Sequence, residues 1–106
     1  MITIEEIQTG EGALAKAGDP VSIHYRGSFP EGGEFDSSYR RNAPFSFKLG
    51  GGQVIQGFDL GVTGMAVGGK RKVTIPPELG YGARGAGGVI PPNATLVFEL
   101  ELLDIR

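Results

Sequence analysis

The sequence predicts an α+β domain in which antiparallel strands pack against one short helix. Three observations support this: several segments alternate apolar and polar residues, one segment has helical spacing, and glycine makes up 19 of the 106 residues. A period of two is typical of strands with one buried face, and intervals of three and four are typical of a helix. The glycine content favours tight turns and close backbone contacts over an all-helical protein.

The strand pattern recurs along the whole chain. The segments that have it are Ile2–Ile4, Val21–Tyr25, Phe45–Leu49, Lys70–Ile75 and Thr95–Ile105. The last is the longest, and its four apolar residues on one face are Leu96, Phe98, Leu100 and Leu102. Glu99 and Glu101 fall on its other face. A sheet with one apolar face and one polar face buries only the first, as antiparallel sheets commonly do.

Only one segment has the spacing of a helix. Its apolar residues recur at intervals of three and four: Ile55, Phe58, Val62 and Met65. The same segment contains Gly57, Gly61 and Gly64, and each glycine costs about 1 kcal/mol relative to alanine inside a helix. This helix is therefore expected to depend on packing against the sheet.

A long loop is expected between the last two strands. Leu79–Asn93 shows no periodicity and is closed by Pro91 and Pro92. Structureless loops longer than about 12–15 residues are uncommon in compact domains and are often functional. This loop keeps Tyr81, Val89 and Ile90, which a fully solvated loop does not need. We expect it to fold over a site.

Composition excludes several classes of function. The chain is expected to form a single domain over residues 1–106. A net charge of -2 gives no field that attracts nucleic acid or a membrane surface. The absence of cysteine removes disulfides and thiol chemistry. No signal peptide or membrane span is recognisable, so a cytoplasmic location is expected, and no cofactor is implied.

Short motifs in the chain suggest other functions, each of which lacks a required part. Gly80–Gly85 matches the dinucleotide pattern G-x-G-x-x-G, but the surrounding prolines prevent the helix that this motif must begin. His24 is the single histidine, and no G-x-S-x-G motif accompanies Ser37 and Ser38. A hydrolase and a metal site are therefore disfavoured. Lys70–Lys72 is expected to be the solvated start of a strand.

The remaining residues that could form a binding site are aromatic. The chain has three tyrosines and six phenylalanines, and no tryptophan. Alternation along strands places some of them in an ordinary core, and an apolar ligand pocket uses the same residue types. Composition and spacing alone do not decide whether these aromatic residues pack in the core or line a ligand pocket.

Four motifs together resemble a known family. They are Phe35–Ser38, Gly57–Gly61, Tyr81–Ala83 and Ile90–Phe98. With them the chain resembles the FKBP family of prolyl isomerases, which bind tacrolimus and rapamycin. The likeness runs from about Val21 to Leu103 and is greatest to the short single-domain bacterial members. It implies a five-stranded antiparallel sheet curled around one short α-helix. It also implies peptidyl-prolyl cis–trans isomerase activity, which assists folding by accelerating rotation about X-Pro bonds.

The resemblance also implies roles for individual residues. Asp36, Tyr81 and Ile55 take the catalytic positions, with the Ile55 N–H and the Tyr81 hydroxyl holding substrate carbonyls and Asp36 accepting hydrogen bonds. Phe58 forms the floor, and the loop after Gly80 covers the site. The substrate-binding set is Tyr25, Phe35, Arg41, Phe45, Val54, Phe58, Val89, Ile90 and Phe98. The ligands implied are proline-containing polypeptides, with tacrolimus or rapamycin as candidates, bound by a monomer.

Three positions depart from the family pattern. Phe58 stands where the best-known members have tryptophan, and Gln53 and Ala86 stand where some have glutamate and histidine. A phenylalanine floor is smaller and has no N–H to donate. A second function therefore stays open: a module that binds a proline-containing segment or a macrolide with little turnover.

Overall fold

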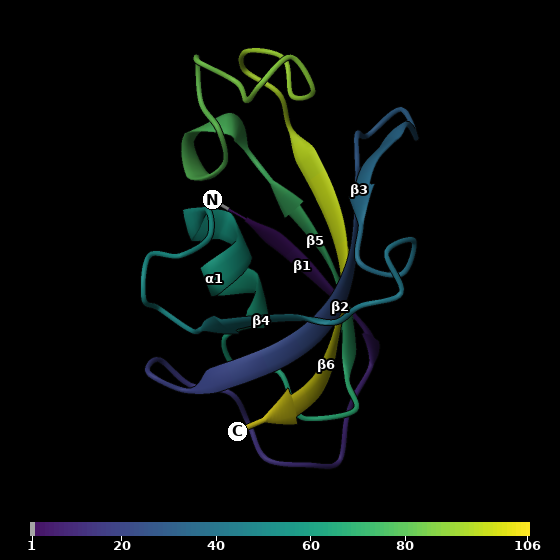
Figure 1. Ribbon diagram of the computed structural model, residues 1–106, viewed down its shortest axis with the longest axis vertical. Helices are drawn as coiled ribbons and strands as arrows, with labels where there is room; N and C mark the ends of the chain where they lie inside the picture. Colours follow the sequence, from purple (N-terminus) through teal and green to yellow (C-terminus); the bar gives the residue numbers. More distant parts are fainter. Residues whose placement is uncertain (1) are drawn as a thin grey trace.

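The computed structural model describes residues 2–106 and has one antiparallel sheet with one α-helix, which confirms the predicted fold class. The strands are β1 (Thr3–Gln8), β2 (Pro20–Ser28), β3 (Glu34–Ser37), β4 (Phe45–Lys48), β5 (Lys70–Ile75) and β6 (Leu96–Ile105). The helices are α1 (Gln56–Val62) and a short 3₁₀ turn, Pro77–Leu79. The sheet order is β1-β5-β6-β2-β3, and β4 also pairs with β2 (Figure 1). No helix among residues 2–106 is long and apolar enough to cross a membrane.

The sheet has six strands, so the prediction of five was wrong by one. The additional strand is β3, which pairs with the end of β2 through Gly27 and Asp36. β4 pairs with the beginning of β2 through Val21 and Phe47. Because β6 pairs with β2 from Val21 to Ser28 on one edge, both short strands lie along the other edge of β2. The sequence of β3 contains two acidic residues and does not alternate, which is why the pattern missed it.

The core lies between the sheet and α1. The predicted inward faces of β2, β5 and β6 are buried: Val21, Ile23, Tyr25, Val73, Ile75, Leu96, Phe98, Leu100 and Leu102. Phe58 and Val62 of α1 complete this cluster. β1, at the edge of the sheet, is exposed along all six residues, so the main contribution of this strand is its pairing with β5.

Two glycines let α1 lie directly on β5. A Cβ atom at Gly57 would come within 2.4 Å of Ile75 Cγ2, and one at Gly61 within 3.0 Å of Val73 Cγ2. Any larger residue would push the helix away from the sheet. These glycines weaken the helix in isolation, as expected from the sequence, but they allow the packing that holds it.

The helix is shorter than its apolar spacing suggested. It ends at Val62, so Met65 lies beyond it, although Met65 is still buried. Arg71 on β5 donates from Nη1 to the carbonyls of Gly61 (3.1 Å) and Thr63 (3.0 Å), and from Nε to Glu6 (3.0 Å). The cation thus satisfies carbonyls at the C-terminal end of α1, where a positive charge is also favourable.

Replacing Arg71 with methionine is expected to lower the free energy of unfolding by about 1.5–3 kcal/mol, because carbonyls at the helix end lose a charged donor. The Arg71 side chain is only 13% exposed, whereas that of Arg26 is 49% exposed and paired at the surface. Arg26→Met is the matched control and should cost less than about 1 kcal/mol. Urea denaturation measures both, and equal losses would contradict this role of Arg71.

Candidate functional site

A pocket of about 210 Å³ opens between the start of α1 and the sheet. β2, β3, β4, β6, α1, the segment before α1 and the loop after β5 all contribute to its wall. Its lining residues are Tyr25, Phe35, Asp36, Phe45, Gln53, Val54, Ile55, Phe58, Tyr81 and Phe98. Nine of these ten residues are in the set implied by the resemblance, and Gln53 is the exception.

Phe58 lies at the centre of the aromatic residues. Its ring meets four others edge to face, with centroid distances of 5.1 Å to Phe98, 5.6 Å to Tyr25, 5.7 Å to Phe47 and 6.5 Å to Phe45. Edge-to-face packing is the favoured geometry for aromatic pairs. The ring is 5% exposed, so Phe58 is both part of the core and the floor of the pocket. The same aromatic residue can therefore pack in the core and line the pocket.

One wall of the pocket carries a polar triad. The Tyr25 hydroxyl donates to Asp36 Oδ2 at 2.7 Å, and Arg41 donates from Nη2 to the Tyr25 hydroxyl oxygen at 2.7 Å. Arg41 also forms an ion pair with Asp36 through Nη1. Arg41 does not line the pocket, so it contacts the pocket wall through Tyr25 and Asp36.

The triad fixes the charge state of its members. Burial acts to raise the pKa of Asp36, but the hydrogen bonds from Tyr25 and Arg41 outweigh burial and hold this pKa below its ordinary 3.8. Burial and the hydrogen bond to Asp36 raise the pKa of Tyr25 above its ordinary 10.0. The ionised Asp36 therefore stabilises the folded state at any pH above its ordinary pKa. This stabilisation is lost only as the pH falls through the lower pKa that Asp36 has in the folded protein. At neutral pH Asp36 is a carboxylate and Tyr25 a neutral donor.

The segment before α1 presents a backbone donor to the pocket. Ile55 is the residue that precedes the helix, in extended conformation with φ -60° and ψ 152°. Its carbonyl accepts from the N–H groups of Phe58 and Asp59, whereas its own N–H has no acceptor among residues 2–106. The N–H at this position lies outside the hydrogen-bond ladder of a helix. It is therefore available to a ligand carbonyl.

The predicted loop over the site is a folded hairpin. Ala86 and Ile90 form an isolated bridge, and the Asn93 N–H donates to the Gly82 carbonyl at 2.9 Å. A second cavity of about 360 Å³ shares part of its wall with the pocket and extends along this loop; its lining is Phe35, Asp36, Tyr81, Ala86, Gly87, Val89 and Ile90. Val89 and Ile90 thus line the neighbouring cavity rather than the pocket itself.

The other motifs do not form a site. His24 Nδ1 lies 2.8 Å from Ser38 Oγ, a pairing of the kind that hydrolases use. Ser38, however, is fully buried, and its Oγ accepts the Tyr25 N–H at 2.7 Å, so no substrate reaches it. No helix begins at Gly80–Gly85. In the sheet, Lys70 lies opposite Glu101 and Lys72 opposite Glu99.

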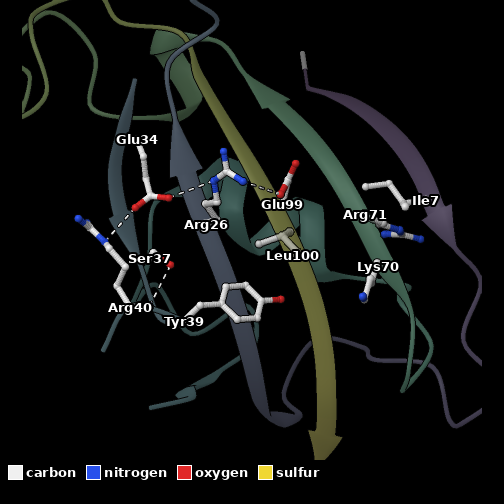
Figure 2. A pocket seen from close by; sticks show the side chains of 10 residues that line it. All are labelled: Ile7, Arg26, Glu34, Ser37, Tyr39, Arg40, Lys70, Arg71, Glu99 and Leu100. Carbon is white, nitrogen blue, oxygen red and sulfur yellow. Dashed lines mark hydrogen bonds and ion pairs between the residues drawn. The ribbon is translucent and has the colours of Figure 1, made fainter. Parts of the chain in front are cut away.

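A larger groove of about 540 Å³ lies away from the aromatic pocket, and Figure 2 shows its lining. Four of its charged residues pair with one another: Glu34 with Arg26 at 3.1 Å and with Arg40 at 2.9 Å, and Arg26 with Glu99 at 3.8 Å. Lys70 and Arg71 also line the groove, and Arg71 pairs with Glu6 outside it. Surface pairs of this kind contribute little energy.

Comparison with known proteins finds similar chains over nearly the whole length. A family model described as FKBP-type peptidyl-prolyl cis-trans isomerase matches residues 11–103. The FK506-binding protein of Neisseria meningitidis is 56% identical over 104 residues, which cover 98% of this chain and 95% of that protein. FK506-binding protein 1 of Dictyostelium discoideum is 54% identical, over 99% of this chain and 98% of that protein.

Solved structures give the same result. The crystal structure of AtFKBP13 superposes with a TM-score of 0.91 at 40% identity, covering 99% of this chain and 93% of that one. The similarity therefore extends over the sheet, the helix and the loop after β5. The chain belongs to the family of FKBP-type peptidyl-prolyl cis-trans isomerases.

Proposed function

We propose that the aromatic pocket is where this chain accelerates rotation about X-Pro bonds, with the proline ring resting on Phe58. The observation that supports this most is the position of Phe58, enclosed by other rings at the base of an open pocket. We also propose that residues 1–106 work as one domain, with Asp36, Tyr81 and Ile55 in catalytic positions and Val54 among the substrate contacts.

The reaction requires neither a nucleophile nor a proton transfer. Rotation about an amide bond faces a barrier of about 18–20 kcal/mol, because resonance must be broken. Uncatalysed X-Pro isomerisation takes tens to hundreds of seconds. Reaching milliseconds requires about 10⁵-fold acceleration, or roughly 7 kcal/mol of preferential stabilisation of the transition state.

An apolar pocket supplies part of this stabilisation by desolvation. The planar amide is strongly polar, and the twisted amide has lost much of its dipole, so a dry wall disfavours the ground state more than the transition state. The free N–H of Ile55 and the hydroxyl of Tyr81 hold the flanking carbonyls. Rotation is then confined to the proline bond.

Asp36 has a positioning role in this mechanism, because no proton moves. Asp36→Asn should lower kcat/KM by about tenfold or less, since asparagine keeps an acceptor for Tyr25 but loses the charge that pairs with Arg41. Steady-state isomerisation of an X-Pro peptide measures the change. A loss of about 10³-fold or more would show that the carboxylate takes part in the chemistry itself.

The proposed activity has one direct test against the binding-module alternative. NMR exchange or a protease-coupled assay on an X-Pro peptide should show faster interconversion, and tacrolimus or rapamycin should inhibit it. Peptide binding without faster exchange would favour a binding module. The relatives named for FK506 binding support a macrolide in this pocket.

The physiological substrates that we propose are unfolded or partly folded chains, bound by a monomer in the cytoplasm. A refolding assay limited by proline isomerisation tests the substrate class. Size-exclusion chromatography and cell fractionation test the other two statements.

A further inference from the structure

The side-chain amide of Gln53 accepts a backbone hydrogen bond through its oxygen, and its nitrogen has no partner among residues 2–106. The Lys48 N–H donates to Gln53 Oε1 at 2.9 Å. A backbone N–H can only donate, so the atom facing it must be the carbonyl oxygen of the amide. The NH₂ group is left with two protons, and no residue in 2–106 accepts either of them. Gln53 also lines the pocket, so this donor is available at the pocket rim.

The segment that carries Gln53 is fixed at several points. The Gly51 N–H donates to the Lys48 carbonyl at 3.1 Å, and the Gly50 N–H donates to Asp59 Oδ1 on α1 at 2.9 Å. A donor that is already held in place loses little conformational entropy when a ligand binds. The rim therefore offers an oriented donor rather than a freely moving side chain.

We propose that Gln53 is a specificity-determining residue that favours substrates with a carboxylate or amide oxygen on the side chain beside proline. This inference rests on the proposed function, in which the Ile55 N–H holds a carbonyl next to proline. Gln53 precedes Ile55 by two residues and both line the pocket, so the amide of Gln53 is placed for the side chain of a neighbouring substrate residue. Asp36, the carboxylate in the pocket, is already paired with Tyr25 and Arg41.

The test measures kcat/KM for peptides that differ only beside proline, with aspartate, alanine or lysine placed after proline in one series and before it in another. In at least one of the two series, the wild-type protein should have a kcat/KM about three- to tenfold higher for the aspartate peptide than for the alanine peptide. This is the range expected of one hydrogen bond. Gln53→Ala should abolish this preference. Gln53→Glu keeps the acceptor for Lys48 but replaces the donor with a charge, so lysine should then be favoured over aspartate.

Gln56→Glu is the matched control, because Gln56 is exposed on α1 and does not line the pocket. It adds the same charge nearby and should leave the aspartate preference within about twofold. A wild-type protein without the preference, or a Gln53→Glu variant that keeps it, would overturn the inference. A wild-type protein that isomerises no peptide, alanine included, would instead refute the proposed function.

Discussion

Phe58→Ala is expected to lower kcat/KM for X-Pro isomerisation by about 10- to 100-fold, because a buried phenylalanine face contributes about 1.5–3 kcal/mol of apolar contact. The ring touches Phe98, Tyr25 and Phe45, so its loss removes the floor and loosens three walls together. The same change should lower the free energy of unfolding by about 3–5 kcal/mol, since it leaves a cavity in the core.

The loss of activity must be separated from the loss of stability. Leu102→Ala is the matched control, because Leu102 is fully buried on β6 and does not line the pocket. It should cost about 2–5 kcal/mol of stability, while the folded fraction keeps its kcat/KM. Urea denaturation and the peptide assay are run on both variants below their unfolding transitions. Equal kcat/KM per folded molecule in both variants would show that Phe58 does not contribute to the activity of the site.

The strands were predictable where one face is buried and the other is solvated. β6 is the clearest case, since Phe98 and Leu100 point into the core while Glu99 is exposed. β3 was not predictable, because its four residues gain their conformation from pairing with β2 and not from their own alternation. Sequence spacing also extended α1 to Met65, which is buried for a different reason: it packs into the core beyond the helix end.

The candidate site was predictable mainly through the family motifs. Residue patterns alone left the aromatics divided between core and pocket, and Phe58 shows why, since it belongs to both. Gln53 departs from the family pattern, but no sequence motif predicts it as a site residue. Its role depends on the turn that brings its oxygen to the Lys48 N–H, and no spacing rule reports such a contact. The one sequence feature that could have indicated a site residue here is its position immediately before Val54 and Ile55.

Gly27→Ala is expected to lower kcat/KM by about tenfold or more by moving two walls of the pocket, although Gly27 itself does not line the pocket. A Cβ atom there would lie 2.7 Å from Phe35 Cζ and 2.8 Å from Phe98 Cε1. Both rings lie in the aromatic cluster, with centroids 5.7 Å apart. Neither ring can move without disturbing its neighbours, and such overpacking costs about 1–3 kcal/mol of stability.

Gly33→Ala distinguishes this steric effect from a general sensitivity to glycine replacement near β3. A Cβ atom at Gly33 would lie 3.7 Å from Phe29 Cδ2, an ordinary contact, so its kcat/KM should stay within about twofold of wild type. The Gly27 variant should also shift the aromatic ring resonances of Phe35 and Phe98 in NMR spectra, because both rings must reorient. Full activity with unshifted resonances would mean that the backbone of β2 moves to accommodate the new methyl group and that the two rings stay in place. In that case the shape of the pocket would depend on the aromatic cluster and not on the absence of a side chain at Gly27.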